Sequence, residues 1–248
     1  MENIGDRGFL LRVDLVRERV EDPAAYPFSL PILRSFTSLE LHPRVTYLVG
    51  ENGSGKSTLL EAIAVAAGFN AEGGTKNFNF ATRSSESPLH RALRLVKSHR
   101  TPRGGFFLRA ESFFNVATKI EELGVGGYGD RSLHEQSHGE SFVSLIQHRF
   151  GEQGLYILDE PEAALSPARQ LSLLSRMHAL VGAGCQFIIA THAPIVLAYP
   201  DALIYELDVD GSPPAPQTYE RTQTVQTTRD FLRDRERWLH RLLADEDP

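Results

Sequence analysis

The sequence predicts an α/β protein with a mostly parallel central sheet, and three observations lead to this prediction. Short apolar strands alternate along the chain with amphipathic helices, as in parallel sheets joined by helical crossovers. Three of these strands, at 45–49, 155–158 and 186–190, are nearly continuously apolar, which is typical of strands covered on both faces. A glycine-rich loop and a helix follow the first of them at once.

The other elements follow from hydrophobic spacing and turn residues. Alternating polar and apolar residues predict a strand at 8–17, and further strands are predicted at 36–41, 105–110 and 202–207. Helical spacing predicts helices at 57–67, 89–96, 112–123, 139–150 and 167–181.

The C-terminal part is predicted to begin with a linker at 213–216, which contains three prolines. Thr228 is expected to cap one terminal helix, whose apolar residues form a stripe that packs as core. These are Phe231, Leu232, Trp238, Leu239 and Leu242.

Composition excludes several classes of protein. A chain of 248 residues can bury a full core without disulfides. The net charge of −6 argues against a nucleic-acid binder held by general basicity, although a local basic groove and contact with DNA stay possible. Cys185 is the single cysteine, which fits a reducing compartment. Without a leader pattern or an apolar run near ~20 residues, the expected location is cytoplasmic and no membrane segment is expected.

The loop from Gly50 to Ser57 matches the phosphate-binding pattern G-x-x-x-x-G-K-[ST] between a buried strand and an apolar helix. Its glycines let backbone N–H groups wrap a phosphate, and the helix adds the positive end of its dipole. The amine of Lys56 can reach the β- and γ-phosphates, and the Ser57 hydroxyl can bind Mg²⁺. The predicted nucleotide-binding residues are Gly50, Glu51, Asn52, Gly53, Ser54, Gly55, Lys56, Ser57 and Thr58.

A second motif ends the strand at 155–158 with Asp159 and Glu160. Carboxylates at the ends of parallel strands lie where ligands bind in open α/β sheets. Asp159 is suited to hold Mg²⁺, and Glu160 can orient or deprotonate the attacking water. A purely structural alternative, in which both residues only cap the next helix, stays open.

The order of motifs over residues 8–207 resembles an ATP-binding-cassette (ABC) ATPase. Ser137 to Ser141 resembles the ABC signature, Ala163 to Ser166 resembles the D-loop, and Ala190 to His192 resembles the switch histidine. The sequence Asp159 to Glu162, together with Thr191 to Pro194, is similar to soluble, stand-alone ATPases of the SMC, RecF and OLD-type branch, which are associated with DNA repair and phage defence.

This resemblance implies a P-loop NTPase fold of ABC type with an antiparallel N-terminal β part. It implies one domain over 1–248, with a helical signature subdomain at about 87–150 and a C-terminal helix at 222–248. It also implies that two chains sandwich two ATP molecules, each with Mg²⁺.

In such a homodimer, Ser137 and Gly139 of one chain would contact the γ-phosphate held by the other, and His192 would sense that phosphate. Ser166 would lie at the D-loop crossing. Glu111 stands where the family has a glutamine and is a candidate to contact Mg²⁺ or its water. Tyr26 or Phe28 could stack on adenine, although aromatic side chains more often pack in a core.

Two further motifs are rejected on their context. His134 to His138 matches the zinc pattern H-E-x-x-H, but nearby glycines argue against the continuous helix that it requires. Gly124 to Gly129 matches the dinucleotide pattern G-x-G-x-x-G, but it follows a predicted helix rather than a strand.

The leading hypothesis is therefore an ATPase that drives a conformational change in an unidentified protein partner. One alternative is the ATP-binding subunit of a membrane ABC transporter. The other is a non-hydrolysing, ATP-gated clamp.

Overall fold

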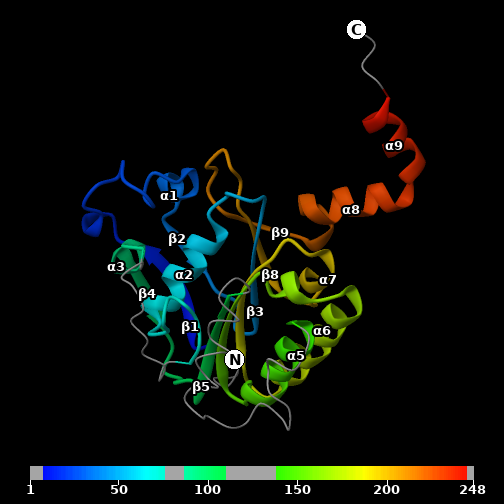
Figure 1. The fold of residues 1–248 in the computed structure, drawn as a ribbon. Coiled ribbons are helices and arrows are strands. Elements are labelled where there is room, and N and C mark those ends of the chain that lie inside the picture. Colours follow the sequence, from blue (N-terminus) through cyan, green and yellow to red (C-terminus); the bar gives the residue numbers. More distant parts are fainter. Residues whose placement is uncertain (1–7, 76–86, 110–137, 245–248) are drawn as a thin grey trace, which may run out of the picture.

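The central sheet has six strands, and the strand that carries the glycine-rich loop lies inside it (Figure 1). The computed structural model describes residues 8–75, 87–109 and 138–244. The strand order is β5–β6–β7–β3–β8–β9, with β9 alone antiparallel to its neighbour among these strands. The predicted mostly parallel α/β sheet is confirmed. The strands are β3 (Val45–Val49), β5 (Gly104–Arg109), β6 (Gly154–Asp159), β7 (Gln186–Ala190), β8 (Leu203–Glu206) and β9 (Ala215–Gln217).

A second, antiparallel sheet forms from the N-terminal part of the chain. Its order is β2–β1–β4, with β1 at Leu10–Leu15, β2 at Ser38–Glu40 and β4 at Leu93–Lys97. The expected antiparallel β part is therefore present, and it includes a strand that the sequence did not predict.

The helix predicted at 89–96 is wrong beyond its first turn. The helix α3 ends at Ala92, and the chain continues as β4, which pairs with β1. Arg94 donates a 2.8 Å hydrogen bond to the buried carboxylate of Asp14, 80 positions earlier. Pairing with a distant strand overrides the local helical spacing here.

Helices cover both faces of the central sheet, and strand alternation sorts the core into two layers (Figure 1). On β6, Tyr156 and Leu158 pack towards α5 and α6, whereas Leu155 and Ile157 pack towards α2 and the small sheet. The helices are α1 (Pro31–Ser35), α2 (Lys56–Ala66), α3 (Leu89–Ala92), α5 (His138–Arg149), α6 (Pro167–Gly182) and α7 (Pro194–Leu197), with short 3-10 turns η2 (Arg17–Arg19), η4 (Pro161–Ala164) and η5 (Tyr219–Arg221).

The predicted helices at 57–67, 139–150 and 167–181 are confirmed as α2, α5 and α6. Each buries a stripe with helical spacing, such as Leu173, Met177 and Leu180 on α6. The helix predicted at 112–123 lies outside the described residues.

The C-terminal part differs from its prediction in three ways. Pro216 lies in β9, at the edge of the sheet, where a missing N–H costs no ladder bond. The terminal helix has Thr222 as its N-cap and begins at Gln223, as the range 222–248 implied, and not at Thr228. It breaks at Asp234 into α8 (Gln223–Arg233) and α9 (Arg235–Leu243).

The apolar stripe of these two helices is not core. No residue of α9 is buried, and the side chains of Leu232 and Leu242 are 73% and 66% exposed. The two helices extend away from the sheet as an arm that ends far from it (Figure 1). In the described part of the chain, no helix has the length and apolarity required to cross a bilayer.

Candidate functional site

The functional motifs predicted from the sequence meet at one edge of the central sheet. Leu48 of β3 and Asp159 of β6 are both paired in register with Ala190 of β7, so all three strands end at the same level. The glycine-rich loop, the two carboxylates and the segment around His192 follow these strand ends. Parallel register therefore brings together groups that are distant in the chain.

The glycine-rich loop requires glycine at both of its ends. Gly50 has φ of +144°, and a Cβ there would lie 2.3 Å from the carbonyl oxygen of Leu207. Gly55 has φ of +91° and is the N-cap of α2, where a Cβ would lie 2.8 Å from Ile32. A side chain at either position would strain the loop, because both positions need the left-handed region and close backbone approach.

Lys56, the first residue of α2, is buried beneath this loop. Its amine donates 2.8 Å hydrogen bonds to the carbonyl oxygens of Gly50 and Glu51. Burial lowers the pKa of Lys56, and the negative charges of Glu160 and Asp159 offset part of this effect. The amine is thus a desolvated cation held by neutral carbonyls, which a phosphate could replace.

The loop also contains a polar atom that lacks a partner. The Ser54 hydroxyl is buried, and no hydrogen-bond partner for it exists among the described residues. A buried hydroxyl without a partner is costly, and a bound phosphate oxygen would satisfy it. This atom therefore supports the fit of the loop to a phosphate group.

The cleft beside the loop has a volume of about 420 Å³. Tyr26 lines it, 65% exposed, and its hydroxyl lies 3.2 Å from the Thr58 hydroxyl. Phe28, the other aromatic candidate, is buried in the core against α2 and the small sheet. Of the two, only Tyr26 is placed to contact a ligand. The remaining lining residues are Leu30, Asn52, Gly53, Gly55, Lys56, Ser57 and Glu160.

Two of the three predicted metal ligands, Ser57 and Asp159, are in contact. The Ser57 hydroxyl donates a 2.9 Å hydrogen bond to Oδ1 of Asp159. Nε of Arg109, at the end of β5, lies 3.7 Å from Oδ2 of Asp159, and its guanidinium donates a 2.6 Å hydrogen bond to Glu61 of α2. The oxygen donors of Ser57 and Asp159 suit a hard cation such as Mg²⁺.

Glu160 adopts an unusual backbone conformation. Its φ of +48° and ψ of +53° lie in the left-handed region, which is rare for residues other than glycine and is found most often at functional sites. Its carboxylate lines the cleft and lies 3.6 Å from Nδ1 of His192. The turn therefore directs this carboxylate away from Asp159 and towards the segment after β7.

Glu162, which is not among the predicted site residues, also contacts the segment after β7. This carboxylate is buried, and its Oε1 accepts hydrogen bonds from the Thr191 hydroxyl at 2.7 Å and from the His192 backbone N–H at 2.9 Å. Its Oε2 is buried and has no partner among the described residues. A charged residue in an otherwise apolar turn was the signal that could have identified it.

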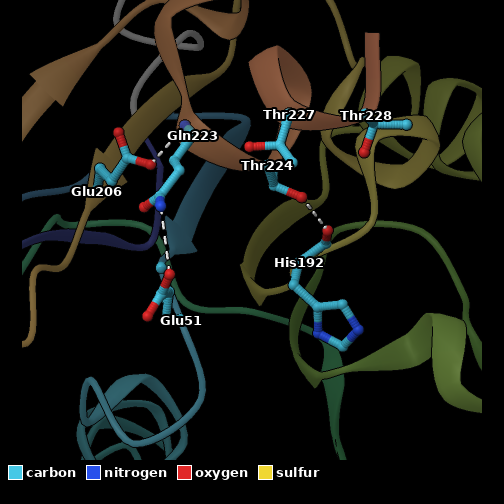
Figure 2. A pocket seen from close by; sticks show the side chains of 8 residues that line it. Glu51, His192, Glu206, Gln223, Thr224, Thr227 and Thr228 are labelled. Carbon is cyan, nitrogen blue, oxygen red and sulfur yellow. Dashed lines mark hydrogen bonds between the residues drawn. The ribbon is translucent and has the colours of Figure 1, made fainter. Parts of the chain in front are cut away.

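A second cleft, of about 290 Å³, lies between the loop and α8 (Figure 2). The amide of Gln223 donates a 3.2 Å hydrogen bond to Glu51, and its backbone N–H donates to Glu206 at 2.8 Å. The Thr224 hydroxyl donates a 2.7 Å hydrogen bond to the carbonyl oxygen of His192. No sequence motif signals these contacts, because they depend on where α8 packs.

Several predicted site residues cannot be placed. Glu111 and Ser137 lie outside the described residues. The rejected motif at 124–129 lies outside them too, as does the one at 134–138 except for its last residue, His138. Gly139 lies in the first turn of α5, and Ser166 is the exposed N-cap of α6. Within the described ranges, no group of three or more His, Cys, Asp or Glu residues could hold a metal ion.

Comparison with known proteins places the glycine-rich loop in a known family. Residues 29–114 match a family described as AAA domain. No curated protein matches the chain significantly in sequence.

Solved structures with a similar fold include the SMC head domain from Thermotoga maritima, at 19% identity and a TM-score of 0.43 over 73% of this chain and 93% of that one. CbiO1 from Clostridium perfringens, part of the ABC transporter complex CbiONQ, is 16% identical with a TM-score of 0.49 over 96% and 100% of the two chains. An SMC head bound to the C-terminal winged-helix domain of ScpA is 13% identical with a TM-score of 0.45 over 74% and 94%.

The predicted similarity to P-loop ATPases is borne out over residues 29–114, the part of the chain that matches an AAA domain. The matched residues include the glycine-rich loop. The strand order brings the loop, the carboxylates and the histidine to one edge of a mostly parallel α/β sheet.

Proposed function

We propose that the chain binds ATP together with Mg²⁺ in the cleft beside the glycine-rich loop and hydrolyses it. The observation that carries this proposal is the convergence of Lys56, Ser57, Asp159 and Glu160 at one sheet edge. Their local surroundings support it, because Ser54 has an unpartnered buried hydroxyl and Ser57 contacts Asp159.

In this proposal the loop binds the phosphates of ATP. Backbone N–H groups of residues 50–58 and the N-terminus of α2 surround the β- and γ-phosphates, and the Lys56 amine leaves the carbonyls of Gly50 and Glu51 to pair with them. The exposed ring of Tyr26 stacks on the adenine. Ser57 and Asp159 would hold Mg²⁺, with Glu111 as a third candidate, and the ion would supply positive charge beside the phosphates.

Glu160 acts on the attacking water. Its left-handed turn points the carboxylate into the cleft, where it can accept a proton from water. In this proposal His192, whose Nδ1 lies 3.6 Å from that carboxylate, contacts the γ-phosphate and orients Glu160.

A second copy of the chain completes the site in this proposal. Ser137 and Gly139 of one copy contact the γ-phosphate bound by the other, and the D-loop around Ser166 crosses between them. Binding and hydrolysis then close and open the homodimer, and this movement acts on a protein partner.

Turnover of Mg-ATP by the purified full chain tests the proposal. The wild-type chain should release phosphate, and Lys56→Ala should lose most of its ATP affinity while keeping its fold. Lys97→Ala, which removes an exposed lysine at the end of β4, is the matched control and should behave as wild type. Unchanged ATP affinity in Lys56→Ala would contradict the phosphate assignment, and ATP binding without turnover would favour the clamp.

A further inference from the structure

Contacts with other elements hold the segment that carries His192. The His192 side chain is 50% exposed, and its Nδ1 lies 3.6 Å from Oε1 of Glu160 and 3.5 Å from Oε1 of Glu162. Its backbone N–H donates to Oε1 of Glu162 at 2.9 Å, and its carbonyl oxygen accepts from the Thr224 hydroxyl at 2.7 Å. The backbone N–H and the carbonyl oxygen of His192 are thus both hydrogen-bonded to side chains from other elements.

We infer that Glu162 and Thr224 are positioning residues of the ATPase site, which hold His192 from two sides so that its ring faces Glu160. The inference rests on the proposed function, because it assigns the two residues a role in hydrolysis through His192. Neither residue lines the cleft that holds Lys56 and Ser57. Their effect should therefore fall on turnover rather than on ATP binding.

Glu162 is the stronger of the two contacts. Its carboxylate is buried, and hydrogen bonds to a buried charge contribute more than neutral ones. It also accepts from the Thr191 hydroxyl, which in turn accepts from the N–H of Ala193. One carboxylate therefore orders three consecutive residues after β7.

Thr224 connects this segment to the C-terminal arm. It follows Gln223, which contacts Glu51 in the glycine-rich loop (Figure 2). The first turn of α8 therefore touches both the loop and the segment of His192. Val225, buried beside them, anchors this turn in the core layer, and α8 packs against α7.

Matched variants separate positioning from bulk structural effects. Glu162→Gln removes the charge but keeps an acceptor oxygen, whereas Glu162→Leu removes both. Thr224→Val removes the hydroxyl that reaches His192. Thr227→Val removes a hydroxyl from the same cleft and helix for which Figure 2 draws no hydrogen bond to His192.

The variants are expected to lower turnover while leaving ATP affinity nearly unchanged. Glu162→Leu should lower kcat by about 10-fold or more and Thr224→Val by about fivefold, as expected for one charge-assisted and one neutral hydrogen bond. Glu162→Gln should stay closer to wild type, Thr227→Val should match it, and ATP affinity should change little in all four. In a His192→Ala background, Glu162→Leu should cause no further loss of kcat, because its effect passes through His192.

Amide hydrogen exchange over residues 187–197, without nucleotide, gives a readout that does not need activity. Exchange at His192 should speed up in Glu162→Leu and Thr224→Val but not in Thr227→Val. Unchanged exchange at His192 in these two variants would overturn the inference. So would a loss of kcat from Glu162→Leu that is the same in the wild-type and the His192→Ala backgrounds. A wild-type chain without turnover would count against the proposed function alone, and exchange would still decide the inference. If Glu162→Leu does not fold, Thr224→Val, in the first turn of a surface helix, still decides it.

Discussion

The Ser57 hydroxyl donates a 2.9 Å hydrogen bond to Oδ1 of Asp159, across 102 residues of chain. The first turn of α2 and the end of β6 thus bring two oxygen donors, the Ser57 hydroxyl and the Asp159 carboxylate, next to each other. The oxygen donors are of the kind that Mg²⁺ prefers, and the contact requires no rearrangement of either element.

Removal of one of these ligands should weaken metal-dependent activity. Asp159→Asn keeps the shape of the side chain but loses its charge, so Mg²⁺ or Mn²⁺ should support turnover far less well. ATP binding measured in excess chelator should stay close to wild type, because Lys56 and the loop are unchanged. Phosphate release across a Mg²⁺ series checks this prediction.

The same preparation tests the rejected zinc motif. Metal analysis of the wild-type chain should find no stoichiometric zinc. One tightly bound zinc per chain, lost when His134 and His138 are replaced, would contradict this expectation.

As pH rises, ATP affinity should begin to fall at a lower pH than it would if Lys56 had the pKa of an ordinary lysine. Only the charged amine of Lys56 attracts phosphate, so its contribution is present below its pKa and is lost as pH rises through it. Because burial lowers the pKa of Lys56 from 10.5, that loss should begin at a lower pH. Calorimetric titration with ATP from neutral pH to about pH 10 measures it.

Lys56→Arg is the control, since a guanidinium stays charged over this range. Its affinity, even if weaker overall, should lack the alkaline decrease. A wild-type chain with the same flat profile would show that Lys56 does not titrate there.

Glu160→Gln should trap an ATP-dependent dimer. The amide keeps the shape of the carboxylate but accepts a proton poorly, so hydrolysis should fall by ~10²–10⁴-fold while binding survives. ATP would then persist between Ser57 of one copy and Ser137 of the other. Sedimentation velocity with and without Mg-ATP should show the dimer only with nucleotide.

Ser137→Arg in the same background should abolish that dimer, because the added side chain would occupy the place of the γ-phosphate of the other copy. ATP should still bind the monomer. A Glu160→Gln chain that hydrolyses normally would remove Glu160 from the role of base, and one that stays monomeric with ATP bound would contradict the composite site.

Tyr26 and Phe28 should respond to mutation in opposite ways. Tyr26→Ala removes an exposed ring from the cleft and should weaken ATP binding by about fivefold or more, without loss of stability. Phe28→Ala opens the core and should lower the free energy of unfolding by about 3 kcal/mol. Nucleotide titration and thermal melts of both variants give the comparison, and a stable Phe28→Ala with poor ATP binding would reverse the assignment.

The sequence alone predicted the central sheet and the chemistry at its edge. The glycine-rich loop, Lys56, Asp159 and Glu160 were identified because each motif is contiguous and follows an apolar strand. Parallel strands end at the same edge, so the meeting of these motifs followed from the fold class.

Contacts between distant segments were decided only by the tertiary structure. The second half of the helix predicted at 89–96 is part of β4, because Arg94 and its neighbours pair with β1, which local spacing cannot reveal. The choice of Tyr26 over Phe28 depended on which ring the core buried.

The position of His192 was likewise predicted in part from the sequence and decided in part by the tertiary structure. The sequence placed the histidine after its strand, but the contacts of Glu162 and Thr224 with its backbone required a turn after β6 and a helix near the C-terminus to pack against it. A sequence motif can specify which groups are present, because their chemistry is local. Their orientation is decided by packing, because the hydrogen bonds that hold them come from elements far apart in the chain.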